Sequence, residues 1–221
     1  EKLLVTVPKG GDKKKLLDLS LKNAAYFLAE SKRAKSLQLG VVKNENKMEV
    51  LEQMEEALQL PNTPVHIECF DNSNFQGSYP VSAMVCFKDG VPSKKDYRHF
   101  NVKSLEAIND LATMNELVYR RYTRLTDEAQ SLPQLIIIDG GKGQLSAAME
   151  SIQELKLHGK ITLIGLAKRE EEIFFPGDSE PLRLPMDGSV LKLIRYIRDE
   201  VHRFGITFHR QKRSKGTFKN A

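Results

Sequence analysis

The sequence has no tryptophan, only two cysteines in 221 residues, and no apolar run near the roughly 20 residues that span a bilayer. It also lacks a signal-peptide pattern at its start. These absences argue against a membrane-embedded or secreted chain. Cys69 and Cys86 both lie in apolar, strand-like runs. We therefore expect buried thiols rather than a disulfide, and a reducing, cytoplasmic setting.

The chain is mildly basic, with a net charge of +5 and a pI near 9.1. Such a balance suits a polyanionic partner but does not require one. Hydrophobic residues make up 40% and charged residues 29%, as in an ordinary globular domain. Because the chain begins at Glu1 rather than Met, we expect it to be a piece of a longer protein.

The first part of the chain has helical periodicity. Residues 13–32 place leucines on one stripe, and Met48–Leu60 predicts a second helix that Pro61 ends. Residues 1–64 are therefore expected to form a helical lead-in.

After this lead-in the pattern becomes that of alternating strands and helices. The order is three strands, helix, strand, helix, strand, helix. The expected strands are 65–71, 81–87, 97–102, 135–138 and 161–167, with a short hairpin over 172–184. The expected helices begin near Asn109, after Gly143 and near Ser189.

Connection rules leave few ways to build this order. It predicts an α/β fold, an RNase H-like mixed five-stranded sheet flanked by helices, over residues 65–210. Residues 211–221 are then a basic tail, expected to be a flexible linker.

Two aspartates end predicted strands, Asp71 after the first and Asp139 after the Ile-rich fourth. If these strands are parallel neighbours, the two carboxylates meet, and a hard cation such as Mg²⁺ or Mn²⁺ relieves their repulsion. The alternative is that each aspartate only forms a turn, within 71–74 or at Asp139-Gly140. Taken together, the pair favours a metal site.

The glycine-rich loop 139–144 does not have phosphate-loop spacing, because Gly143 follows Lys142, and Ser146 stands where a dinucleotide fingerprint has its third glycine. Its backbone N–H groups still suit a phosphate, which we expect to belong to DNA.

The last helix places Arg195, Asp199 and His202 on one face. An Arg195–Asp199 ion pair is the simpler interpretation of the first two, and His202 is either a boundary histidine or part of the metal site. Asp110 stands where a helix N-cap belongs, so capping and a peripheral metal-site role are both open.

Several long motifs, in order, resemble the UvrC family, one of the proteins of the bacterial excinuclease. They are Ile67–Ser73, Gly77, Val81–Phe87 with Asp89-Gly90, Tyr97–Phe100, Met114–Tyr122, Ile138–Gln144 and Arg198–Phe204. The resemblance implies an RNase H-like nuclease, similar to endonuclease V, that cuts damaged DNA on the 5′ side of a lesion.

The same resemblance implies catalytic roles for Asp71, Asp139 and His202, with Asp110 as a fourth implicated acid. A histidine in place of a carboxylate leaves open whether one or two ions bind. The family's GIY-YIG domain, UvrB-contacting hairpin and helix-hairpin-helix repeats are not recognisable, so we expect weak DNA binding without lesion targeting.

Five basic residues are candidates for contacts with the DNA backbone. They are Lys142, Arg120, Arg121, Arg198 and Arg203. One rival hypothesis is a catalytically silent RNase H-like module that binds nucleic acid or a protein. Another is an enzyme that uses the glycine loop for nucleotide phosphates.

Overall fold

The computed structural model describes residues 8, 10–25, 28, 47–73, 81–101, 110–167 and 171–217. The chain divides into two compact units, Glu1–Lys43 and Asn44–Ala221. In the first unit, residues 11–25 are helical, as the leucine periodicity predicts. The rest of the expected helix up to residue 32, apart from helical Leu28, lies outside the described residues. Among the described helices, none is long and apolar enough to cross a membrane.

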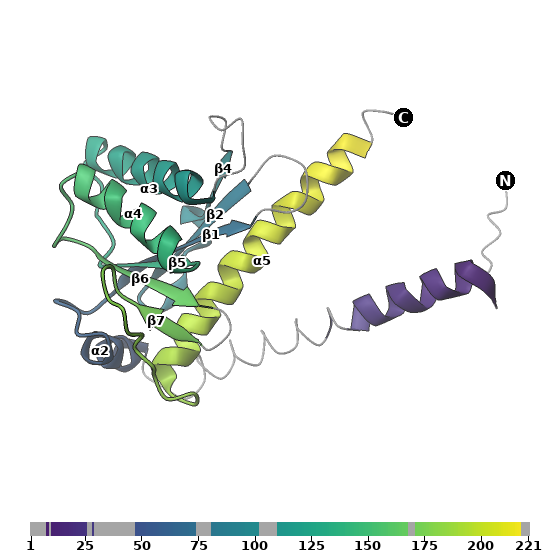
Figure 1. Ribbon diagram of the computed structural model, residues 1–221, viewed down its shortest axis with the longest axis horizontal. Helices are drawn as coiled ribbons and strands as arrows, with labels where there is room; N and C mark the ends of the chain where they lie inside the picture. Colours follow the sequence, from purple (N-terminus) through teal and green to yellow (C-terminus); the bar gives the residue numbers. More distant parts are fainter. Residues whose placement is uncertain are drawn as a thin grey trace. The chain divides into compact units, whose positions relative to one another are not determined.

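The second unit consists of a twisted sheet between helices (Figure 1). Its helices are α2 (Lys47–Ala57), α3 (Asp110–Asp127), α4 (Lys142–Glu154) and α5 (Ser189–Thr217), with a short 3₁₀ helix η1 (Lys94–Asp96). Its strands are β1 (His66–Ser73), β2 (Val81–Lys88), β3 (Val91–Pro92), β4 (Arg98–Asn101), β5 (Leu135–Asp139), β6 (Thr162–Ala167) and β7 (Glu172–Phe174).

The sheet has the order β3-β2-β1-β5-β6-β7, and β4 also pairs with β2. β1, β5 and β6 are parallel, whereas the pairs β1–β2, β2–β4 and β6–β7 are antiparallel. The mixed sheet and the strand meander are confirmed. The sheet has seven strands rather than five, because β3 and β7 also join it. These strands have two and three residues, too few for a periodic pattern.

Asp89 and Gly90 form the turn between β2 and β3. Both residues have positive φ, 51° and 72°, as a two-residue hairpin requires. The hairpin expected over residues 172–184 is reduced to a single bridge between Ile173 and Leu182. Strand β7 pairs with β6 instead.

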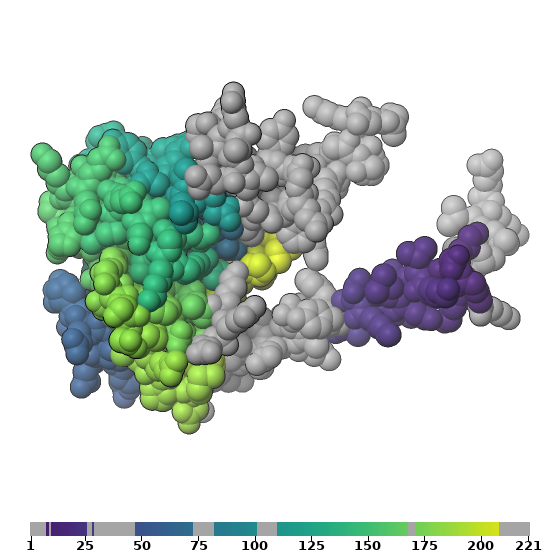
Figure 2. All heavy atoms as spheres, in the orientation of Figure 1, coloured from purple at the N-terminus to yellow at the C-terminus, as the bar shows by residue number. Residues whose placement is uncertain are grey.

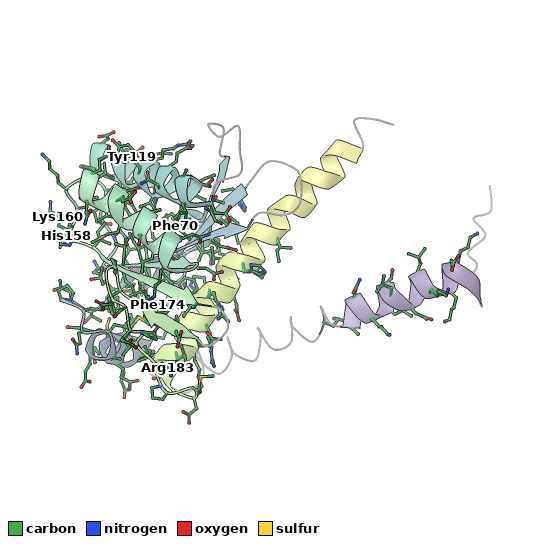
Figure 3. All side chains as sticks on the ribbon, in the orientation of Figure 1. Phe70, Tyr119, His158, Lys160, Phe174 and Arg183 are labelled. Atoms are coloured by element: carbon green, nitrogen blue, oxygen red, sulfur yellow. The ribbon has the colours of Figure 1, made fainter. Side chains whose placement is uncertain are left out.

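The two faces of the sheet are covered by different helices. Helices α3 and α4 pack side by side on one face, and α5 with α2 covers the other (Figure 1). Because side chains alternate along a strand, Ile67, Cys69 and Asp71 point to the α5 face, and Glu68 and Phe70 to the α3 face. Phe70 lies beneath the α3–α4 layer (Figure 3). Both cysteines are free and buried, as expected.

The core extends beyond the expected range of 65–210 on its N-terminal side. Helix α2, expected in the lead-in, buries Val50, Leu51 and Met54 in the same core as α5. In the space-filling view its surface adjoins the segment before α5 (Figure 2). Leu58 and Leu182 line a groove between the two. Helix α5 continues to Thr217, into the segment expected to be a flexible tail.

Candidate metal and nuclease site

Asp71 and Asp139 are direct partners across the parallel β1–β5 pair. Each stands at or near the carboxyl end of its strand, and both point toward α5. They are nearly buried, with 2% and 4% of their surface exposed. The run Leu135–Ile138 is buried on both faces, which fixes β5 in the middle of the sheet and so fixes the register that joins the two acids.

Helix α5 brings the third group. The Nδ1 atom of His202 lies 3.1 Å from Oδ2 of Asp71, and the His202 side chain is 49% exposed. One ligand atom from each of Asp71, Asp139 and His202 lies within 4.8 Å of the other two. The three groups therefore converge, as expected, and two carboxylates with one imidazole are a donor set that could hold a divalent metal ion.

A second group with metal-like spacing occurs among the described residues. It consists of His66, Glu68 and Cys86, near the opposite end of β1. Here the Arg121 guanidinium and the Tyr122 hydroxyl both donate to Glu68. A positive charge already neutralises this carboxylate, so the group is poorly suited to a cation.

The segment after Asp71 is strand rather than turn. β1 continues to Ser73, and the Ser82 hydroxyl donates to the Asn72 side chain. Asn72 Nδ2 in turn donates to the backbone carbonyl of Asp110, at 2.9 Å. Asn72 thus links the first residue of α3 to the strand that carries Asp71, a role that neither the turn interpretation of 71–74 nor the motif indicates. Asp110 therefore lies near the site, although its carboxylate is not one of the three clustered groups.

The glycine loop turns the chain from Asp139 into α4. Gly141 is the N-cap and has no side chain with which to cap α4, so the N-cap residue leaves the first N–H groups of the helix, which begins three residues after Asp139, without a side-chain acceptor. Gln144 folds back over Gly140, where a Cβ would lie 1.8 Å from its Oε1 atom. Lys142 Nζ donates to the Ser179 carbonyl at 2.7 Å and lies 4.6 Å from the centre of the Phe174 ring.

Two of the five expected DNA-contact residues have other roles. The Arg121 side chain is 11% exposed and pairs with the buried Glu68. The Arg198 side chain is 16% exposed and pairs with Glu171 and Asp199. Their guanidinium groups are committed within the protein, which argues against a contact of either with DNA. The prediction of an Arg195–Asp199 ion pair is wrong. The Nε atom of Arg195 lies 3.2 Å from the Oε1 atom of Glu171 instead.

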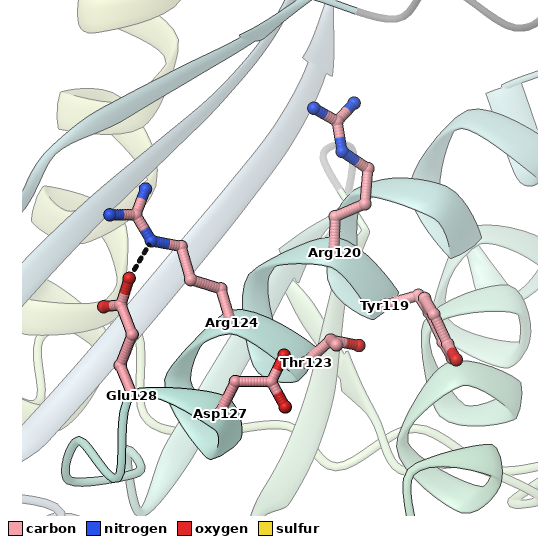
Figure 4. Close-up of a pocket in the computed structure, with 6 residues that line it drawn as sticks. All are labelled: Tyr119, Arg120, Thr123, Arg124, Asp127 and Glu128. Carbon is pink, nitrogen blue, oxygen red and sulfur yellow. Dashed lines mark hydrogen bonds and ion pairs between the residues drawn. The ribbon is translucent and has the colours of Figure 1, made fainter.

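The other two arginines are more exposed. Arg203 is 54% exposed and donates two hydrogen bonds to Glu200. Arg120 is 53% exposed, pairs with Glu116, and lies about 15 Å along α3 from Asp110. It lines a shallow groove of about 360 Å³ on α3 with Tyr119 and Arg124 (Figure 4).

The electric field at the carboxylate pair acts on the thiol beneath it. Burial raises the pKa of Cys69 well above its ordinary value, and the negative charges of Asp139 and Asp71 raise it further, whereas the Arg198 charge lowers it. All three charges therefore lie close to this thiol.

Residues 55–206, more than half of the chain, match the family described as the UvrC RNase H endonuclease domain. The chain belongs to this family. It is 58% identical over its full length to the UvrABC system protein C of Flavobacterium johnsoniae, and 55% identical over 96% of its length to that of Cytophaga hutchinsonii. It spans 36% and 34% of the lengths of these relatives.

Among solved structures, the chain is similar to an endonuclease V of Ciona intestinalis, in complex with a 24mer DNA that contains an inosine followed by a ribo-adenosine. The TM-score is 0.35 and the identity 19%, over 53% of this chain and 55% of the other.

Proposed function

We propose that this chain is the endonuclease core of a nucleotide-excision-repair excinuclease, which hydrolyses one DNA phosphodiester on the 5′ side of a lesion. The proposal is carried by the convergence of Asp71, Asp139 and His202 at one sheet edge, within a chain of the UvrC endonuclease family. In the intact protein the DNA substrate would be lesion-containing duplex, and UvrB the partner that the family implies. The setting would be the cytoplasm.

Asp71, Asp139 and His202 would together hold Mg²⁺ or Mn²⁺. When bound, such an ion polarises the scissile phosphate and stabilises the charge that develops on it. The two aspartates are buried and neighbouring, so they present their negative charge toward one point. Asp110, whose backbone carbonyl accepts a hydrogen bond from Asn72, is the candidate for a peripheral acidic role.

His202 is suited to proton transfer as well as to metal binding. In the neutral tautomer that donates Nδ1–H to Asp71, its Nε2 keeps a lone pair. Since the ring is 49% exposed, Nε2 can reach a substrate or a water molecule. Asp71 would then fix the tautomer and the orientation of the ring.

DNA would be held by groups around this edge. Lys142 stands at the uncapped start of α4, and Arg203 follows His202 on α5. Arg120, farther along α3, is a candidate for a more distant phosphate. Such contacts position the DNA backbone without reading its sequence.

Incubation of the chain with supercoiled plasmid tests the proposal. We expect Mn²⁺ to support conversion to the nicked form, and EDTA to reduce it to the level of a protein-free control. Binding of DNA with no nicking in Mn²⁺ or Mg²⁺ would instead favour a catalytically silent nucleic-acid-binding module. Nucleotide-induced thermal stabilisation without nicking would favour a nucleotide-phosphate enzyme.

A further inference from the structure

We propose that Arg198 is a positioning residue, which clamps α5 to the β6–β7 turn and thereby sets the place of His202 beside Asp71. This inference rests on the proposed function, since it assigns the groups that hold the metal-binding histidine. The clamp consists of Arg198, Glu171 and Asp199.

Arg198 lies one helical turn before His202, so both side chains leave α5 on the same flank. Its charge is felt by the Cys69 thiol together with the charges of Asp71 and Asp139. Cys69 points to the α5 face of the sheet, as Asp71 does, so the Arg198 charge acts on the face that carries the paired aspartates.

The guanidinium of Arg198 is held by two carboxylates. Its Nη1 donates to Glu171 Oε2 at 2.7 Å, and its Nη2 and Nε donate to Asp199 Oδ1 at 2.9 and 3.1 Å. The Arg198 and Glu171 side chains are each 16% exposed, so water screens this pair less than a surface pair. A planar guanidinium that bridges two carboxylates has little freedom to rotate.

Glu171 belongs to the sheet side of the site. It directly precedes β7, and β7 pairs with β6. Strand β6 in turn lies parallel to β5, which carries Asp139. Glu171 has a φ of 55°, an uncommon backbone conformation for a residue with a side chain. The Glu171–Arg198 pair therefore joins the strands that place Asp139 to the helix that places His202.

A positioning role and a purely electrostatic role of Arg198 predict opposite changes in the affinity of the site for a divalent cation. If Arg198 only added positive charge near the aspartates, its removal would strengthen the binding of a divalent cation. If it positions His202, its removal weakens that binding, because one ligand is no longer held in place. Groups that orient metal ligands typically change affinity or activity by about 10–100-fold.

The test compares Arg198→Gln, Arg198→Lys, Glu171→Gln and the double variant Arg198→Gln/Glu171→Gln with the wild-type chain. Mn²⁺ binding is measured from the electron paramagnetic resonance signal of free Mn²⁺, and plasmid nicking is measured in parallel. We expect the Kd for Mn²⁺ to rise about 10-fold in Arg198→Gln, with a smaller rise in Arg198→Lys. Glu171 also pairs with Arg195 of α5, so Glu171→Gln removes both of its links to the helix. The double variant should therefore be no weaker than Glu171→Gln, because the Arg198 change then has no further link to Glu171 to break.

Arg183→Gln is the matched control. Arg183 pairs with Glu172, the residue next to Glu171, and should leave Mn²⁺ binding unchanged. Circular dichroism identifies variants that do not fold, and Glu171→Gln provides a second test should Arg198→Gln be among them. An unchanged or lowered Kd in folded Arg198→Gln or Glu171→Gln overturns the clamp. If wild type and Asp71→Asn bind Mn²⁺ equally, the proposed function fails as well.

Discussion

Replacement of Asp71 or Asp139 by asparagine is expected to lower Mn²⁺-dependent nicking by about 10³-fold or more, which corresponds to the several kcal/mol that a bound ion contributes to the transition state. Each change removes one negative charge from a nearly buried pair while keeping the side-chain size. The amide is a weaker ligand for a hard cation. The measurement is the initial rate of conversion of supercoiled to nicked plasmid.

Asp178→Asn provides the control for this pair of variants. It makes the same chemical change at an exposed position in the segment between β7 and α5, and should nick at the wild-type rate. Nicking by Asp71→Asn or Asp139→Asn within a few-fold of wild type would exclude the clustered carboxylates as the source of the activity.

Replacement of Glu68 by glutamine is expected to destabilise the fold by about 3–5 kcal/mol, because it leaves the Arg121 charge buried without its partner. Glu68 is fully buried and accepts hydrogen bonds from Arg121 and from the Tyr122 hydroxyl, the latter at 2.8 Å. Urea unfolding at pH 7, followed by circular dichroism, measures the loss. Glu128→Gln, which breaks the exposed pair with Arg124, should cost less than about 1 kcal/mol.

The same carboxylate should make stability depend on pH. Burial opposes the ionisation of Glu68, but its interactions with His66, Arg121 and Tyr122 hold the pKa below the ordinary value of 4.5. The contribution is therefore complete above pH 4.5 and is lost as the pH falls through the lowered pKa. In Glu68→Gln, the free energy of unfolding should therefore decrease less as the pH falls below 4.5, which is the acid limb of the stability curve. A cost near that of Glu128→Gln, or an unchanged acid limb, would contradict the assigned role of Glu68.

The two aspartates were predictable because each directly follows the apolar part of a strand, although β1 itself continues to Ser73. The buried run Leu135–Ile138 identifies a central strand, and a central strand places its terminal acid beside that of a parallel neighbour. The helical period of α5 placed His202 on one face of the helix but left open whether it is a boundary histidine or part of the metal site, and its catalytic role was implied by the resemblance to the UvrC family. What these residues share is a local signal, either the end of a strand or one face of a helix.

The ion pairs were not predictable, because their partners are distant in sequence. Spacing along α5 suggested an Arg195–Asp199 pair, but Glu171 from the β6–β7 turn engages Arg195, and Arg198 takes Asp199. In the same way, the strand alternation gave no sign that the α3 layer fully buries Glu68, or that Arg121 would be drawn to it. Only the packing of the elements brings these charges together.

Anomalous diffraction from crystals of the chain soaked in Mn²⁺ tests most directly whether these three groups hold one ion. We expect a peak bound by oxygens of Asp71 and Asp139 and by a nitrogen of His202, at roughly 2.0–2.3 Å from each. A chain that nicks DNA in Mn²⁺ but has no peak there, or has its peak at His66, Glu68 and Cys86 instead, would contradict the proposed site.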